Sequence, residues 1–232
     1  MKRLALFLLI AGLAIASCGG DGEPAPPDPD FDVEALIADA AVAMGSVETA
    51  RFTMERSGAA VSFAGIEFNE AAGQYAAPDS ARAVLQVRVG DLSAELGTVA
   101  IGEQVWLTNP LTGGWEEIAP GTGFNIAIVF DPDQGWVPLL TEDLADVVYL
   151  GRRPAEGGDR EVIAGEISAE RVEFLTAGLV EAQSVDAEIW IDPVGGHISR
   201  VEFETNLDGA ISQWVIEMED FGAPVTITAP AS

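Results

Sequence analysis

The sequence predicts an α+β fold in which one large, curled antiparallel sheet carries helices on one face. Three observations support this class. Most of the chain alternates apolar and polar residues with a period of two, which is typical of strands with one buried face. Turns rich in glycine, proline and aspartate separate these runs. A few shorter segments have helical spacing instead, and we find no internal repeat.

The chain begins with the pattern of a secretory signal peptide. Lys2 and Arg3 precede an apolar run over residues 4–15, and small residues follow. The run is shorter than the roughly 20 residues that cross a membrane. We therefore expect residues 1–17 to be removed.

The residues Ile15-Ala16-Ser17-Cys18 resemble the lipobox of bacterial lipoproteins. The resemblance implies that Cys18 receives a diacylglyceryl group and becomes the first residue after cleavage. Cys18 is the only cysteine, so it has no partner for a structural disulfide. The expected location is the outer face of the cell membrane, with the protein held there by the lipid. The alternative is an ordinary signal peptide followed by a chance cysteine.

The composition is that of a globular but strongly acidic chain. Apolar residues make up 48% of the 232 residues, which is enough for one domain with a sizeable core. The formal net charge is -27, and Lys2 is the only lysine. Such a surface repels phosphate backbones, so we expect no nucleic-acid partner. It also has no basic cluster for anionic lipid, so membrane attachment depends on Cys18.

Residues 19–30 read GGDGEPAPPDPD. Glycine, proline and aspartate at this density cannot form a core, so we expect residues 18–31 to be the lipidated cysteine and a flexible linker. The linker would reach about 40 Å when extended. A single folded domain is expected over residues 32–232.

The clearest helix is predicted over residues 32–45. Asp32 is a suitable N-cap, and Gly45 is a natural stop. The apolar residues of this segment share one helical face: Val33, Leu36, Ile37, Ala40, Ala41 and Met44. We expect this face to cover one side of the sheet.

Strands are predicted on both sides of an irregular middle segment. The first group covers residues 47–55, 61–63, 66–68, 82–89, 92–96, 104–108 and 115–118. The second group covers residues 147–152, 160–167, 187–191, 197–206 and 211–219, with 225–228 as a last edge strand. The short turns between them predict an antiparallel meander.

Two further helices are predicted around this second group. An apolar run over residues 124–130 and a turn over 131–135 lead into a short helix over 136–144, with Leu139 and Leu140 facing inward. Ser168 is expected to cap a helix that ends at Thr176. Val172 and Leu175 lie on the inner face of that helix.

No residue pattern indicates catalysis or metal binding. His197 is the only histidine, and Ser199 is two residues away on the same strand face, which is not the geometry of an activated nucleophile. Asp131-x-Asp133-x-Gly135 begins like a calcium loop but lacks the later acidic ligands. We therefore predict no catalytic residue, no metal site and no cofactor.

The aromatic residues raise the question of what fills the concave side of the sheet. Trp106, Trp190 and Trp214 have polar neighbours, and we expect them on the face away from the helices. Helices can fill the concave side completely, or they can leave a dry apolar cavity. A dry cavity of this kind accepts apolar ligands.

Several short motifs occur in a characteristic order. They are Met44-Gly45-Ser46-Val47, Val105-Trp106-Leu107, Gly114-Trp115, Phe130-Asp131-Pro132, Ile189-Trp190-Ile191-Asp192, Arg200-Val201-Glu202-Phe203 and Val225-Thr226-Ile227-Thr228-Ala229-Pro230. With the lipobox and the acidic linker, they resemble the LppX/LprG-type lipoproteins of actinobacteria over most of residues 32–230. The resemblance implies a half-barrel sheet with helices on its concave face, LolA-like, around a hydrophobic cavity. It also implies a non-enzymatic carrier of lipids or glycolipids.

We therefore predict a membrane-anchored protein that binds acyl chains and carries them across the cell envelope, with an envelope transporter as a further candidate partner. The cavity is expected between sheet and helices, lined by Leu85, Val87, Ile126, Ile128, Leu139, Leu140, Val172 and Leu175. One alternative is a non-catalytic adaptor with a filled core that binds a protein through its sheet. A hydrolytic enzyme that depends on His197 is the hardest alternative to sustain.

Overall fold

The computed structural model describes residues 30–63, 65–119, 125–176 and 178–231. The predicted signal peptide, Cys18 and most of the linker lie outside the described residues, as does Phe124. Within the described residues, no helix is long and apolar enough to cross a membrane.

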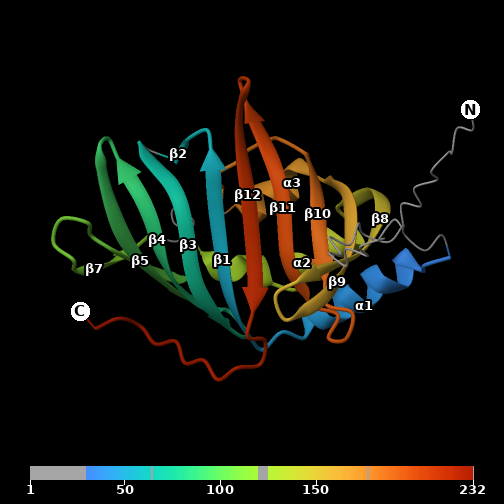
Figure 1. Cartoon of the computed structure of the whole chain (residues 1–232). Helices are drawn as coiled ribbons and strands as arrows, with labels where there is room; N and C mark the ends of the chain where they lie inside the picture. Colours follow the sequence, from blue (N-terminus) through green and yellow to red (C-terminus); the bar gives the residue numbers. More distant parts are fainter. Residues whose placement is uncertain (1–29, 64, 120–124, 177, 232) are drawn as a thin grey trace, which may run out of the picture.

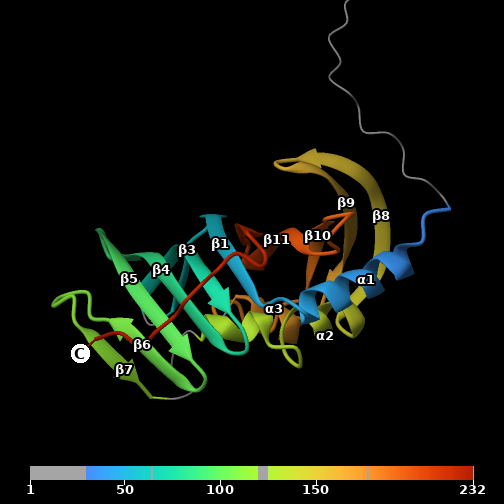
Figure 2. The same cartoon turned by 90° about the horizontal axis from the view of Figure 1, so that it is seen from below.

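Twelve strands form one antiparallel sheet, which arches around the helices without closing into a barrel (Figures 1 and 2). The strands are β1 (Thr49–Gly58), β2 (Val61–Phe63), β3 (Ile66–Ala76), β4 (Ser80–Val89), β5 (Leu92–Ile101), β6 (Gln104–Thr108), β7 (Trp115–Ile118), β8 (Leu144–Ala155), β9 (Gly158–Ile167), β10 (Val185–Ile191), β11 (Ile198–Leu207) and β12 (Ala210–Glu219). Their spatial order is β7-β6-β5-β4-β3-β1-β12-β11-β10-β9-β8, and β2 pairs with β3 outside this row. The fold class predicted from the sequence is confirmed.

Strand β10 shows how the sequence specifies the two faces of the sheet. Val185, Ala187, Ile189 and Ile191 are buried, whereas Asp186 between them is exposed. Because successive side chains of a strand point to opposite faces, the apolar set reaches the core and the polar set does not. The register follows from the same requirement, since a slip by one residue would exchange the two sets.

The helical layer lies on the concave face of the sheet (Figure 2). It consists of α1 (Val33–Gly45), the 3-10 helix η1 (Ile126–Phe130), α2 (Trp136–Thr141) and α3 (Ala169–Leu175). The two predicted caps are confirmed, because the side chains of Asp32 and Ser168 accept hydrogen bonds from the amides of Ala35 and Arg171.

The predicted end of the second helix is wrong. Helix α2 ends at Thr141, and Leu144 already begins β8. The amides of Glu142 and Asp143 both donate to the carbonyl oxygen of Pro138, at 2.9 and 3.1 Å, and this closes the last turn.

The predicted edge strand over residues 225–228 is also wrong, because these residues pair with no strand. Both edges of the preceding strand β12 are already occupied by β1 and β11. After β12, Asp220 adopts a positive φ of 54° and the amide of Gly222 donates to the carbonyl of Thr49. The chain therefore leaves the sheet as a C-terminal tail, residues 221–231, which runs from the end of β12 toward β6 and β7 (Figures 1 and 2).

The tryptophans divide between the two faces of the sheet. Trp214 was expected on the face away from the helices, but it is fully buried in the core and stacks between Phe68 and Phe203, with ring centroids 5.8 and 6.0 Å away. Trp190 does lie on the outer face, because it alternates with the core residues Ile189 and Ile191 and has an arginine on either side. Trp106 alternates with the core-facing Leu107 in the same way.

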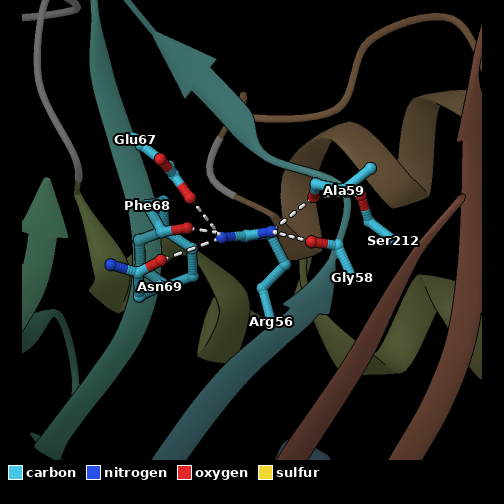
Figure 3. Close-up of polar contacts among 7 residues, drawn as sticks. All are labelled: Arg56, Gly58, Ala59, Glu67, Phe68, Asn69 and Ser212. Atoms are coloured by element: carbon cyan, nitrogen blue, oxygen red, sulfur yellow. Dashed lines mark hydrogen bonds and ion pairs between the residues drawn. The ribbon is translucent and has the colours of Figure 1, made fainter. Parts of the chain in front are cut away.

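Arg56 fixes the corner where β1, β2 and β3 meet (Figure 3). Its side chain is only 4% exposed, and it reaches across the bulge that shifts the β3–β4 register between Phe68 and Glu70. Its guanidinium donates to the carbonyl oxygens of Gly58, Ala59 and Phe68 and to the side chains of Glu67 and Asn69. One side chain thus ties the end of β1 to the bulged part of β3 through both backbone and side-chain oxygens.

Candidate functional site

An apolar cavity lies between the centre of the sheet and the helical layer. Its volume is about 40 Å³. The sheet contributes Phe52, Met54, Phe68, Ala71, Leu85, Ile216 and Met218. The helices contribute Ile126, Val129, Phe130, Trp136 and Leu175, and the segment after α3 contributes Thr176 and Leu179. Thr176 is the one polar residue among them, and its hydroxyl donates to the carbonyl of Val172 and accepts from the amide of Val180. The cavity is therefore suited to hydrocarbon.

A second apolar cavity of about 50 Å³ lies beside the first. It is lined by Ile66, Phe68, Leu85, Val87, Leu96, Leu107 and Leu179. Phe68, Leu85 and Leu179 line both cavities. These three side chains therefore separate the two spaces.

Both cavities are small for a ligand site. Pockets that hold drug-sized ligands measure about 300–1,000 Å³, whereas each cavity here has room for a few atoms. Cavities with apolar walls of this kind stay dry. The helices thus fill most of the concave side in this conformation, and an acyl chain enters only if part of the wall moves.

The two ends of α3 are held differently. At its start, Arg171 is buried and its Nε and Nη2 atoms lie 3.0 and 2.7 Å from Oδ2 of Asp143, which follows α2. The hydroxyl of Ser168 donates to the other oxygen of the same carboxylate. Beyond its end, the chain carries Leu179, which is only half-buried. The amide of Leu179 donates to the carbonyl of Thr176 at 3.0 Å, but moving the Leu179 side chain would break no buried ion pair.

The eight predicted cavity residues divide into two groups. Leu85, Val87, Ile126 and Leu175 line one or both cavities. Leu139, Leu140 and Val172 are buried in the surrounding core, and Ile128 packs against it, but these four line neither cavity. The aromatic and methionine residues of the wall, and Leu179, were not among the residues predicted from the sequence. Alternation places Phe52, Met54, Ile216 and Met218 on buried faces, but only the pairing of β1 with β12 brings them together.

His197 and Ser199 have separate partners. The imidazole of His197 stacks on the ring of Phe221, with centroids 4.2 Å apart. Burial lowers the pKa of His197, against an opposite effect of the Asp192 carboxylate. The hydroxyl of Ser199 donates to the carbonyl of Trp190. Among the described residues, no group of His, Cys, Asp and Glu could hold a metal ion.

Comparison with known families decides the classification. The sequence model of the LppX_LprAFG lipoprotein family matches residues 32–227. The chain belongs to this family. The match covers all twelve strands and the three α-helices.

Similar proteins agree with this membership. The lipoarabinomannan carrier protein LprG of Mycobacteroides abscessus is 20% identical over 99% of this chain and 97% of its own length. LprG of Mycobacterium tuberculosis is 22% identical over 99% of this chain and 95% of its own length. These relatives are named as carriers rather than enzymes.

Two solved structures share the fold. LprF from Mycobacterium bovis superposes with a TM-score of 0.66 at 14% identity, covering 90% of this chain and 100% of LprF. LppX from Mycobacterium tuberculosis superposes with a TM-score of 0.61 at 17% identity, covering 85% of this chain and 100% of LppX.

Proposed function

We propose that this protein is a membrane-tethered carrier that holds acyl chains of a lipid or glycolipid between its sheet and its helices. The observation that supports this most is the pair of predominantly apolar cavities that share Phe68, Leu85 and Leu179. Membership in a lipoprotein family with relatives named as lipoarabinomannan carriers makes a glycolipid the first candidate cargo. The cargo would be carried across the cell envelope, away from the membrane that holds the protein.

Loading requires the two cavities to join. Displacement of Leu179 removes one of the three side chains that separate them. Met54 and Met218 lie in the wall, and methionine side chains adapt their shape at little cost. Each methylene buried contributes about 0.8 kcal/mol, so a chain of a dozen carbons offsets the free energy needed to move one leucine.

Native mass spectrometry of the protein purified from a lipid-producing actinobacterial host tests this proposal. We expect ions heavier than the bare protein by the mass of one lipid, and acyl chains in the solvent extract. Bare protein alone, under conditions that retain the ligand of a known lipid carrier, would contradict acyl-chain binding. A stoichiometric protein partner with no extractable lipid would instead support the adaptor alternative.

The tether is proposed to be the lipid on Cys18, attached after removal of residues 1–17. Replacing Cys18 with serine is expected to move the protein from the membrane fraction to the soluble or secreted fraction, because two or three acyl chains are lost together. Replacing Ser17 with alanine keeps a small residue before Cys18 and is expected to leave the protein in the membrane fraction. An unchanged membrane fraction for Cys18→Ser would mean that the apolar segment itself is the anchor.

A further inference from the structure

A groove of about 900 Å³ lies on the face of the sheet opposite the cavities. It crosses β1, β3, β4 and β5, and residues 228–231 of the C-terminal tail form one wall. Alternation along the strands shows that the groove is on the outer face of the sheet. Arg51, Gln74 and Arg82 line it, and each is next in sequence to a core residue: Phe52, Tyr75 and Ala81, respectively. Those three polar residues are direct cross-strand neighbours and form a ladder along the groove.

The floor of the groove is made of small side chains beside an aromatic wall. Thr53, Ala72, Val84 and Gly97 are neighbours across four strands. The indole of Trp115 lies over Gly97, since a Cβ atom at this glycine would be 2.8 Å from Cη2 of Trp115. The absence of a side chain at Gly97 therefore lets a flat aromatic surface border the groove.

The charge of the groove is opposite to that of the whole chain. The chain has 38 Asp and Glu residues against 11 Lys and Arg, yet the described residues that line the groove include two arginines and no carboxylate. Arg51 is paired with Asp220 at 3.1 Å. Arg82 donates from Nε and Nη2 to the side-chain oxygen of Gln74, at 2.9 and 2.5 Å, and among the described residues no carboxylate pairs with it.

We propose that this groove binds an anionic sugar, with the acidic group at Arg82 and the sugar ring against Trp115. A guanidinium binds phosphate or carboxylate through paired, charge-assisted hydrogen bonds. Gln74 already accepts from Nε and Nη2 of Arg82 and holds the guanidinium in place, so less side-chain freedom is lost on binding. The opposite edge of the guanidinium, with Nη1 and the second Nη2 hydrogen, is the one that would donate to the acidic group. The indole supplies an apolar surface, and the ladder supplies further donors for hydroxyl groups. The sugar is either the headgroup of a carried lipid or a saccharide of the envelope.

The groove shares one lining residue with the cavities, Phe52, and acyl-chain binding on the other face of the sheet is tested separately. Titration of the purified protein with glucose 6-phosphate, followed by NMR of the Trp115 indole and the Arg82 Nε–H groups, tests the groove site directly. We expect saturable shifts of both signals, and weaker ones with glucose. Replacing Arg82 with glutamine is expected to weaken binding about tenfold or more, since a hydrogen bond to a charged group is lost.

Arg88→Gln is the matched control, because Arg88 lies on the same face of β4 but outside the groove. It is expected to leave binding unchanged. Absence of saturable shifts, or equal loss in Arg82→Gln and Arg88→Gln, would overturn the proposal. Binding of a phosphosugar glycolipid is then compared with binding of its deacylated headgroup. Equal binding of the two ligands, lost in Arg82→Gln, supports recognition of the sugar alone. Binding of the acylated form only, unchanged in Arg82→Gln, would overturn the groove site while leaving the cavity proposal intact.

Discussion

Replacement of Arg56 by leucine is expected to lower the free energy of unfolding by about 1.5–3 kcal/mol, the range for losing hydrogen bonds to a charged group. The guanidinium donates to the Phe68 carbonyl at 2.6 Å and to the side chains of Glu67 and Asn69 at 2.9 and 2.8 Å (Figure 3). Without it, the Glu67 carboxylate, whose side chain is only 23% exposed, loses its ion-pair partner. The Ala59 carbonyl keeps a donor in the hydroxyl of Ser212.

Urea unfolding of the purified variants measures this loss. Arg51→Leu is the matched control on the same strand, because Arg51 and its partner Asp220 are 52% and 50% exposed and such pairs contribute about 0–1 kcal/mol. We expect Arg56→Leu to unfold at a much lower urea midpoint with an unchanged slope, and Arg51→Leu to stay close to the parent. Similar midpoints for the two variants would show that the Arg56 contacts are not a main source of stability.

The sheet could be predicted from the sequence where the period of two is unambiguous. Strand β4 is such a case, and its inner residues Leu85 and Val87 are buried while Arg82 and Arg88 are exposed. Strand β12 is ambiguous, because Trp214, Val215 and Ile216 are three apolar residues in succession. Apolar residues would be buried whether the odd or the even positions of this segment faced the core, so alternation alone could not place Trp214 in the core.

The cavity could be predicted only in part, for two physical reasons. Its walls come from strands that are distant in sequence. Strands β1 and β12 are adjacent in the sheet, but they are the first and the last strands of the chain. In α2, four of the six residues are buried: Trp136, Pro138, Leu139 and Leu140. Burial alone therefore does not reveal which side of this helix faces empty space, and of the four only Trp136 lines a cavity.

Replacement of Leu179 by tryptophan is expected to reduce acyl-chain binding about tenfold or more. Leu179 lines both cavities, so a larger side chain there occupies the passage that a chain must use. Exclusion of only two methylenes from the cavity corresponds to about 1.6 kcal/mol, which is more than tenfold in affinity. Because Leu179 is half-buried and lies after the end of α3, the indole can turn partly toward solvent and the fold should tolerate it.

The opposite change supplies the sharper test of the mechanism. Leu179→Ala removes part of the wall between the two cavities without touching the Arg171–Asp143 ion pair, so it is expected to strengthen or accelerate uptake of a fluorescent fatty acid. Leu92→Trp is the control for adding an indole, because Leu92 is 74% exposed at the β4–β5 turn. We expect this variant to bind the fatty acid as the parent does. If Leu179→Trp and Leu179→Ala both bind as the parent does, the chain does not enter between Phe68, Leu85 and Leu179. If both variants lose binding while folded, Leu179 contacts the lipid itself and does not act as the movable part of the wall.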